Sequence, residues 1–193
     1  MGRWAMLTAL FLSGVAAAQT PPSLSGALAE RNRVCTGCHG ADGNSAMAGT
    51  PSIAGQPQVF LENQLVLIRE GLRGSAVMQN LLKDLPDRDL VALSRYYTAL
   101  PLRAPDVVVD SARAQRGRTL AGELRCGVCH LKDYSGQKQI PRLAGQREDY
   151  LYASMLEFRD SPRPGGDTQM SAVLYRVPDA DLRALAHYLA TFR

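Results

Sequence analysis

One five-residue word occurs twice in this chain and strongly limits what the chain can fold around. The word reads C-x-x-C-H, and its two copies span Cys35–His39 and Cys126–His130. Together they contain all four cysteines of the chain. C-x-x-C-H is the attachment signal of a c-type haem. The two copies therefore predict two covalently attached haem c groups.

The spacing within the word lets its three reactive side chains act on one group. On a helical turn, positions i, i+3 and i+4 lie on the same face. The two thiols would then form thioether bonds to the porphyrin edge, and the neighbouring imidazole would bind the iron from one side. The residues concerned are Cys35, Cys38 and His39 in the first copy, and Cys126, Cys129 and His130 in the second.

Three other kinds of cysteine site remain as alternatives to haem. A thioredoxin-like dithiol also uses C-x-x-C, but it needs no following histidine, and no βαβ pattern is evident here. A structural zinc site requires four ligands at compact spacing, whereas these two pairs lie far apart in the sequence. Structural disulfides suit an exported chain, although C-x-x-C forms a tight and often reactive loop.

The N-terminus predicts export. Arg3 is followed by an apolar run from Trp4 to Val15 and then by small residues up to Ala18, which is typical of a secretory signal peptide over residues 1–18. The run is shorter than the ~20 residues of a spanning helix, so an uncleaved anchor is the alternative. No later stretch has the character of a membrane span. Because bacteria attach haem c outside the cytoplasmic membrane, we expect a periplasmic protein.

The charge of the chain does not predict a nucleic-acid partner. The chain has 22 Lys and Arg against 18 Asp and Glu, a net charge of +4. Removal of Arg3 with the leader lowers this to +3, and two haem groups would add four propionates that offset it. No long run of like charge remains to attract a polyanion.

The sequence around each C-x-x-C-H is duplicated. Both copies continue into the word P-x-[I/L]-A-G-Q, at 51–56 and at 141–146. A helix-like stretch follows in each copy, at 57–70 and at 147–159, and a second one starts after Pro86 or Pro178. Self-similarity of this kind indicates two copies of one structural unit.

The residue periodicity predicts an all-α fold. Leu61, Leu65, Ile68 and Leu72 recur at i, i+4, i+7 and i+11, along one face of a helix. Asp87 and Asp179 fall in predicted first turns, where negative charge stabilises a helix.

The two halves are predicted to be separate helical domains. Val107–Val109 is the only β-like run, and it lies in an extended, proline-containing linker at 101–110. The domains are expected at 19–103 and 104–193. Each is small for an independent core, so the haem would supply part of its apolar volume.

A methionine in each copy is the best candidate for the second axial ligand of each iron. Met78 and Met170 occupy equivalent places, shortly before Pro86 and Pro178 respectively. A thioether ligand opposite histidine raises the haem potential and closes the iron to small oxidants. The alternative for either methionine is a core-filling role.

Three other side chains could bind iron but fit the duplication less well. Met155 lies on a predicted helix face and is expected in the core. Met47 has no counterpart in the second copy. His187 aligns with an arginine, so it is expected to be exposed or to lie at a domain interface.

These features resemble the dihaem cytochromes c of the cytochrome c4 type. The resemblance covers nearly all of the mature chain, and its motifs are both C-x-x-C-H and P-x-[I/L]-A-G-Q words, Met78, Met170 and Leu185–Leu189. It implies two class I cytochrome c lobes. Members of that family are periplasmic electron carriers, some of them membrane-associated, that feed terminal oxidases or serve dehydrogenases. The chain departs from the family after His130, where Leu131–Gly136 replaces the common G-A-D-G of the first copy.

We therefore expect single-electron transfer between a respiratory donor and an acceptor such as a terminal oxidase, rather than an enzymatic reaction. A quinol-oxidising complex, a terminal oxidase or a dehydrogenase would be the partner. The alternatives are an electron-transfer subunit of a dehydrogenase or oxidase complex, a dihaem peroxidase, and a gas-binding module. The last two need an open iron. Pro51 and Pro141 either brace the histidines through their carbonyls or serve only as turn residues.

Overall fold

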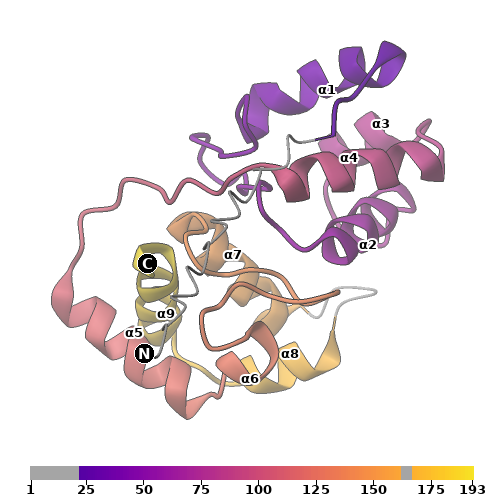
Figure 1. Ribbon diagram of the computed structural model, residues 1–193. Helices are drawn as coiled ribbons and strands as arrows, with labels where there is room; N and C mark the ends of the chain where they lie inside the picture. The colour runs from indigo at the N-terminus through magenta and orange to yellow at the C-terminus, as the bar shows by residue number, and fades with distance from the viewer. Residues whose placement is uncertain (1–21, 162–166) are drawn as a thin grey trace, which may run out of the picture.

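The computed structural model describes residues 22–161 and 167–193, and these residues form helices joined by loops (Figure 1). The helices are α1 (Gly26–His39), α2 (Gln58–Arg69), α3 (Ala76–Leu82), α4 (Asp87–Ala99), α5 (Ser111–Glu123), α6 (Gly127–His130), α7 (Glu148–Asp160), α8 (Thr168–Leu174) and α9 (Asp179–Thr191). Within these ranges no strand forms, and one isolated bridge joins Gln137 to Ile140. The predicted all-α class is confirmed.

The helices pack into two groups, each with its own core. Helices α1–α4 form the N-terminal lobe and α5–α9 form the C-terminal lobe, and the two lie one above the other in Figure 1. An extended segment between Leu100 and Asp110 joins them, and its Val108 is 94% exposed. The boundary between residues 103 and 104 falls in this segment and stays a prediction.

The four longest predicted helices form close to their expected positions. Helices α2 and α7 cover the stretches predicted at 57–70 and 147–159. Helices α4 and α9 begin directly after Pro86 and Pro178, and each has two aspartates in its first turn. A proline before the first turn costs no helical hydrogen bond, and carboxylates there stabilise the positive end of the helix dipole.

Leu72 does not belong to the buried face of α2, which corrects the periodicity prediction. The helix ends at Arg69, and the N–H of Leu72 bonds back to the carbonyl of Leu67 at 2.8 Å. Gly71 carries the chain away from the helix axis there, so Leu72 is 46% exposed. Of the other members of the predicted face, Leu61 and Ile68 are buried and Leu65 is half-buried against the core.

The two C-x-x-C-H words sit on differently built helices. The first ends the continuous helix α1, whereas the second begins at Cys126, the N-cap of the short α6, which a turn separates from α5. Arg125 has a positive φ of 56° in that turn, and the N–H of Cys126 reaches back to the carbonyl of Ala121. The turn therefore changes the direction of the chain between α5 and the second C-x-x-C-H word.

The described residues contain no helix whose length and apolar character would let it cross a bilayer. The predicted signal peptide, residues 1–18, lies outside the described residues.

Candidate functional site

Each lobe presents its C-x-x-C-H word with two free thiols and a buried imidazole. Cys35 and Cys126 are half-buried against their lobe cores, while Cys38 and Cys129 are exposed. None of the four forms a disulfide. Among the described residues, no three His, Cys, Asp or Glu side chains gather as a metal site.

The carbonyl groups of Pro51 and Pro141 fix the tautomers of His39 and His130. His39 Nδ1 lies 2.9 Å from the carbonyl oxygen of Pro51, and His130 Nδ1 lies 2.8 Å from that of Pro141. A carbonyl oxygen can only accept, so Nδ1 must carry the proton in both rings. The lone pair of the neutral ring is then on Nε2, which makes no hydrogen bond to a described residue. These are the bonds that the bracing role of the prolines requires.

Burial keeps both imidazoles in the form that binds metal. The side chains of His39 and His130 are only 6% and 7% exposed. Loss of hydration lowers the pKa of each ring below its ordinary value, and the bond to the proline carbonyl opposes this only in part. A neutral imidazole needs no proton release before it binds iron.

Met78 and Met170 take equivalent positions on two short helices that the sequence did not predict. Each is the third residue of a seven-residue helix, α3 or α8, and each is half-buried against its lobe core. An N-cap side chain, Ser75 or Asp167, accepts a backbone N–H in the first turn of each helix. The matched placement is what two equivalent iron ligands require.

The structure places the three competing side chains elsewhere. Met155 is buried in the C-terminal core, as expected, and Met47 is 46% exposed. His187 is neither exposed nor at the contact between the lobes, which corrects that expectation. It is 2% exposed, its Nδ1 lies 2.8 Å from Glu148, and its Nε2 accepts the N–H of Asp110. With both nitrogens engaged, it offers no lone pair to a metal.

These donors fit a haem c in each lobe. Every lobe supplies two unpaired thiols, one neutral imidazole held through Nδ1, and one thioether on a separate short helix. Apolar side chains stay only partly buried against each core, such as Leu28 and Phe60 in the N-terminal lobe and Leu124 and Leu143 in the C-terminal lobe. Covalently bound haem c is accordingly the cofactor that the donor set calls for.

The sequence divergence after His130 preserves the turn that follows each word. Gly40 and Gly43 have φ of 85° and 75°, and their counterparts Leu131 and Tyr134 have φ of 68° and 55°. In both lobes the carbonyl at the second of these positions accepts two backbone N–H groups from the P-x-[I/L]-A-G-Q word. The ring of Tyr134 packs edge-on against Tyr188 and Phe192. The second lobe therefore keeps this turn with side-chain-bearing residues where the first lobe has glycine.

Gly40→Ala is expected to destabilise the N-terminal lobe by about 2 kcal/mol, because its φ and ψ lie in a region where side chains are strained. A Cβ there would also clash with the carbonyl oxygen of Asn44. Denaturant unfolding followed by optical absorbance measures the change. Leu131→Ala is the control, since a side chain already occupies that turn, and a loss at Gly40 no larger than at Leu131 would contradict the account.

The two lobes dock through their P-x-[I/L]-A-G-Q words, a contact that sequence reasoning did not identify. Gln56 pairs with the backbone of Arg142, and Gln146 pairs with the backbone of Ser52, the residue equivalent to Arg142. The glutamine that ends both words was the sequence signal for this contact. The two glutamines are only 2–3% exposed, but their burial could not be predicted without knowing that the two copies face each other.

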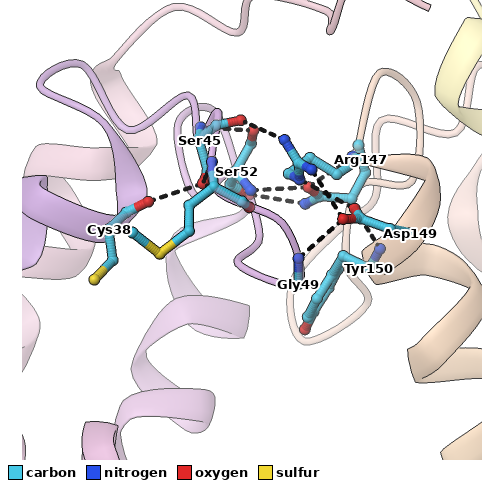
Figure 2. Close-up of polar contacts among 9 residues, drawn as sticks. Cys38, Ser45, Gly49, Ser52, Arg147, Asp149 and Tyr150 are labelled. Atoms are coloured by element: carbon cyan, nitrogen blue, oxygen red, sulfur yellow. Dashed lines mark hydrogen bonds and ion pairs between the residues drawn. The ribbon is translucent and has the colours of Figure 1, made fainter.

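Further polar contacts border this pairing (Figure 2). The N–H of Gly49 donates to Asp149 at 2.9 Å, and the guanidinium of Arg147 reaches the carbonyl of Ser45 at 3.2 Å. Tyr150 receives a bond from Arg73 at 2.6 Å. Burial opposes ionisation of Asp149, but the bonds from Arg147 and the two backbone N–H groups outweigh it and lower the pKa of that carboxyl.

Arg142 is a buried cation at the centre of the lobe contact. It is 6% exposed, and its guanidinium donates to the carbonyls of Ala54, Gly55 and Ala144. Among the described residues no carboxylate pairs with it. Burial lowers its pKa to about 10, so the side chain remains charged at neutral pH.

Arg142→Leu is expected to lower the free energy of unfolding by about 2–3 kcal/mol, because buried carbonyl groups lose their donors. Arg142→Lys keeps the charge but cannot reproduce the guanidinium fork, so we expect a smaller loss. Thermal unfolding of both variants measures the effect. Equal stability of Arg142→Leu and the wild type would show that the guanidinium contributes nothing net.

The comparisons with known proteins agree with this geometry. The family model described as cytochrome c matches residues 114–193. Cytochrome c4 of Pseudomonas aeruginosa is 31% identical over 95% of this chain and 94% of its own length. A protein of Thiomonas intermedia named as a thiosulfate dehydrogenase electron acceptor is 33% identical over 96% of this chain and 88% of its own.

A solved structure has the same architecture. The crystal structure of reduced recombinant cytochrome c4 from Pseudomonas stutzeri superposes with a TM-score of 0.78 at 29% identity. The match covers 88% of this chain and all of that one.

Proposed function

Because the chain belongs to the cytochrome c4 family, we propose that it is a periplasmic carrier of single electrons between a respiratory donor and an acceptor such as a terminal oxidase. Family membership establishes the coarser statement, which is that this is an electron-transfer protein with covalently bound haem c. The ligands, the compartment and the partners are the parts we propose.

The observation that carries the proposal is that each lobe has its own buried histidine and its own half-buried methionine in matched places. In the N-terminal lobe we assign His39 and Met78, and in the C-terminal lobe His130 and Met170. The cysteines to which the haem groups would be joined are Cys35, Cys38, Cys126 and Cys129. When bound, each haem supplies one reversible one-electron couple at its iron.

The residues proposed as ligands would favour rapid electron transfer and would keep peroxide and dioxygen from the iron. A histidine fixed through Nδ1 and a thioether on a short capped helix would hold the iron with little rearrangement between oxidation states. If His39 and Met78, and His130 and Met170, held the two irons, neither lobe would leave a position open to peroxide or dioxygen. A dihaem peroxidase would need one ligand that leaves, and both methionines have the same helical support.

The test of this function is the reaction of the reduced protein with two kinds of oxidant. We expect rapid oxidation by a redox-protein partner or an outer-sphere oxidant, and no turnover of hydrogen peroxide above that of free buffer. Catalytic peroxide consumption, or a high-spin iron signal in the oxidised wild type, would overturn the carrier assignment.

A second candidate is an electron-accepting subunit of a dehydrogenase. The similarity to the Thiomonas intermedia protein, whose name describes that role, favours it. Size-exclusion chromatography of a native periplasmic extract separates the two candidates. Elution at the mass of a single chain supports a free carrier, and co-elution with a dehydrogenase supports the subunit.

A further inference from the structure

The peptide group that braces each proximal histidine is itself held by the opposite lobe. The carbonyl of Pro51 accepts from His39, and the N–H of the same peptide group, on Ser52, donates to Gln146 Oε1 at 2.8 Å. In the other lobe, the carbonyl of Pro141 accepts from His130, and the N–H of that peptide group donates to the second glutamine at 2.9 Å. The linkage is therefore crossed and reciprocal.

The glutamine amides are fixed in the orientation that this linkage needs. A backbone N–H can only donate, so each facing amide must present its oxygen. Gln146 Nε2 then donates to the carbonyl of Ser52 at 2.8 Å, and Gln56 Nε2 donates to the carbonyl of Arg142 at 3.0 Å. Gln146 Oε1 also accepts the N–H of Arg147. Each amide thus makes a two-point pair with one residue of the other lobe.

Burial makes these bonds strong and keeps water from replacing them. Gln56, Gln146 and Ser52 are 2–3% exposed, and Arg142 is 6% exposed. In such surroundings hydrogen bonds in a chain polarise one another. Donation from the peptide N–H increases the negative charge on the carbonyl oxygen at the other end of the same conjugated group. That oxygen then attracts the histidine Nδ1–H more strongly, and Nε2 becomes a better electron donor.

We propose that Gln146 and Gln56 are positioning residues that set the reduction potential of the haem site in the opposite lobe. Gln146 acts on the site of His39, and Gln56 acts on the site of His130. Stronger donation from Nε2 favours the oxidised iron, so each glutamine lowers the potential across the lobe contact. This inference rests on the proposed ligation by the two histidines.

The test is a redox titration of the complete dihaem protein, with each site followed separately. The methyl resonances of the axial methionines, assigned with M78A and M170A, report the two sites by proton NMR. For Gln146→Leu we expect the ratio of reduced to oxidised N-terminal site to rise about tenfold at a fixed potential, the lower end of outer-shell effects at metal sites. The C-terminal site should change much less. Gln56→Leu should give the reverse pattern.

Two further variants separate this role from simple docking. Gln146→Glu keeps an acceptor for the Ser52 N–H but loses the donor Nε2, so the N-terminal site should not rise above its wild-type potential. Tyr150→Phe removes a lobe-to-lobe bond that touches neither proximal peptide, and both potentials should stay unchanged. Equal shifts of both sites in Gln146→Leu, or a shift in Tyr150→Phe as large, would mean that only docking matters and would overturn the proposal.

The spectrum of the wild-type protein tests the ligands separately from the effect of the glutamines. If the wild-type protein lacks the spectrum of two histidine–methionine sites, the ligand assignment is wrong. If that spectrum is present and Gln146→Leu leaves the N-terminal potential unchanged, only the proposed effect of the glutamine on the opposite lobe is wrong.

Discussion

Replacing Cys35 and Cys38 by alanine is expected to leave one covalently bound haem per chain. The amides of the N-terminal lobe should also lose their protection from hydrogen exchange. The buried core of that lobe contains seven apolar residues among those described, against fourteen in the C-terminal lobe. So small a core buries too little surface to offset the entropy of ordering about 80 residues. The haem must therefore supply a large share of the apolar contact.

Haem content after acid extraction and amide exchange by mass spectrometry measure this prediction. The matched variant, with Cys126 and Cys129 replaced by alanine, should also keep one haem but retain more protection in α5 and α9. Its larger core gives that helix pair more support of its own. Wild-type protection in α1–α4 of the first variant would contradict the view that the haem is part of the core.

Met78→Ala and Met170→Ala are each expected to open one iron and leave the other closed. Each variant should lose about half of the long-wavelength absorbance that a methionine–iron bond gives, and the affected site should fall in potential. It should also gain affinity for added imidazole or carbon monoxide. The two sites should respond alike, because α3 and α8 hold their methionines at the same helical position.

Met47→Ala and Met155→Leu are the controls for this pair. Met47 is exposed in a loop and Met155 is buried in the C-terminal core, so neither change should alter the absorbance. If the band survives in full in both Met78→Ala and Met170→Ala, the ligand assignment is wrong.

The part of this structure that the sequence predicted is the part that local rules determine. The helices after Pro57, Pro86, Arg147 and Pro178 follow from apolar periodicity and from proline before a first turn. The haem motif fixes a histidine next to a cysteine on one helical turn. The duplication then singled out a methionine in each copy from the other candidates.

The features that were missed depend on contacts between residues distant in sequence. His187 aligns with an arginine of the first copy, so the sequence suggested an exposed position. In the structure it is buried and forms hydrogen bonds with Glu148 and with the N–H of Asp110. The buried roles of Gln56, Gln146 and Arg142 arise only when the two lobes dock. A polar residue in a repeated word is equally compatible with solvent until its partner surface is known.

A redox titration of the whole protein, with optical spectra recorded at each potential, shows whether both irons are closed. We expect two one-electron transitions, a methionine–iron band that accounts for both haems in the oxidised state, and spectra that added peroxide leaves unchanged. A single transition of one haem, or an oxidised spectrum with a high-spin iron that reacts with peroxide, would contradict a carrier with two closed sites.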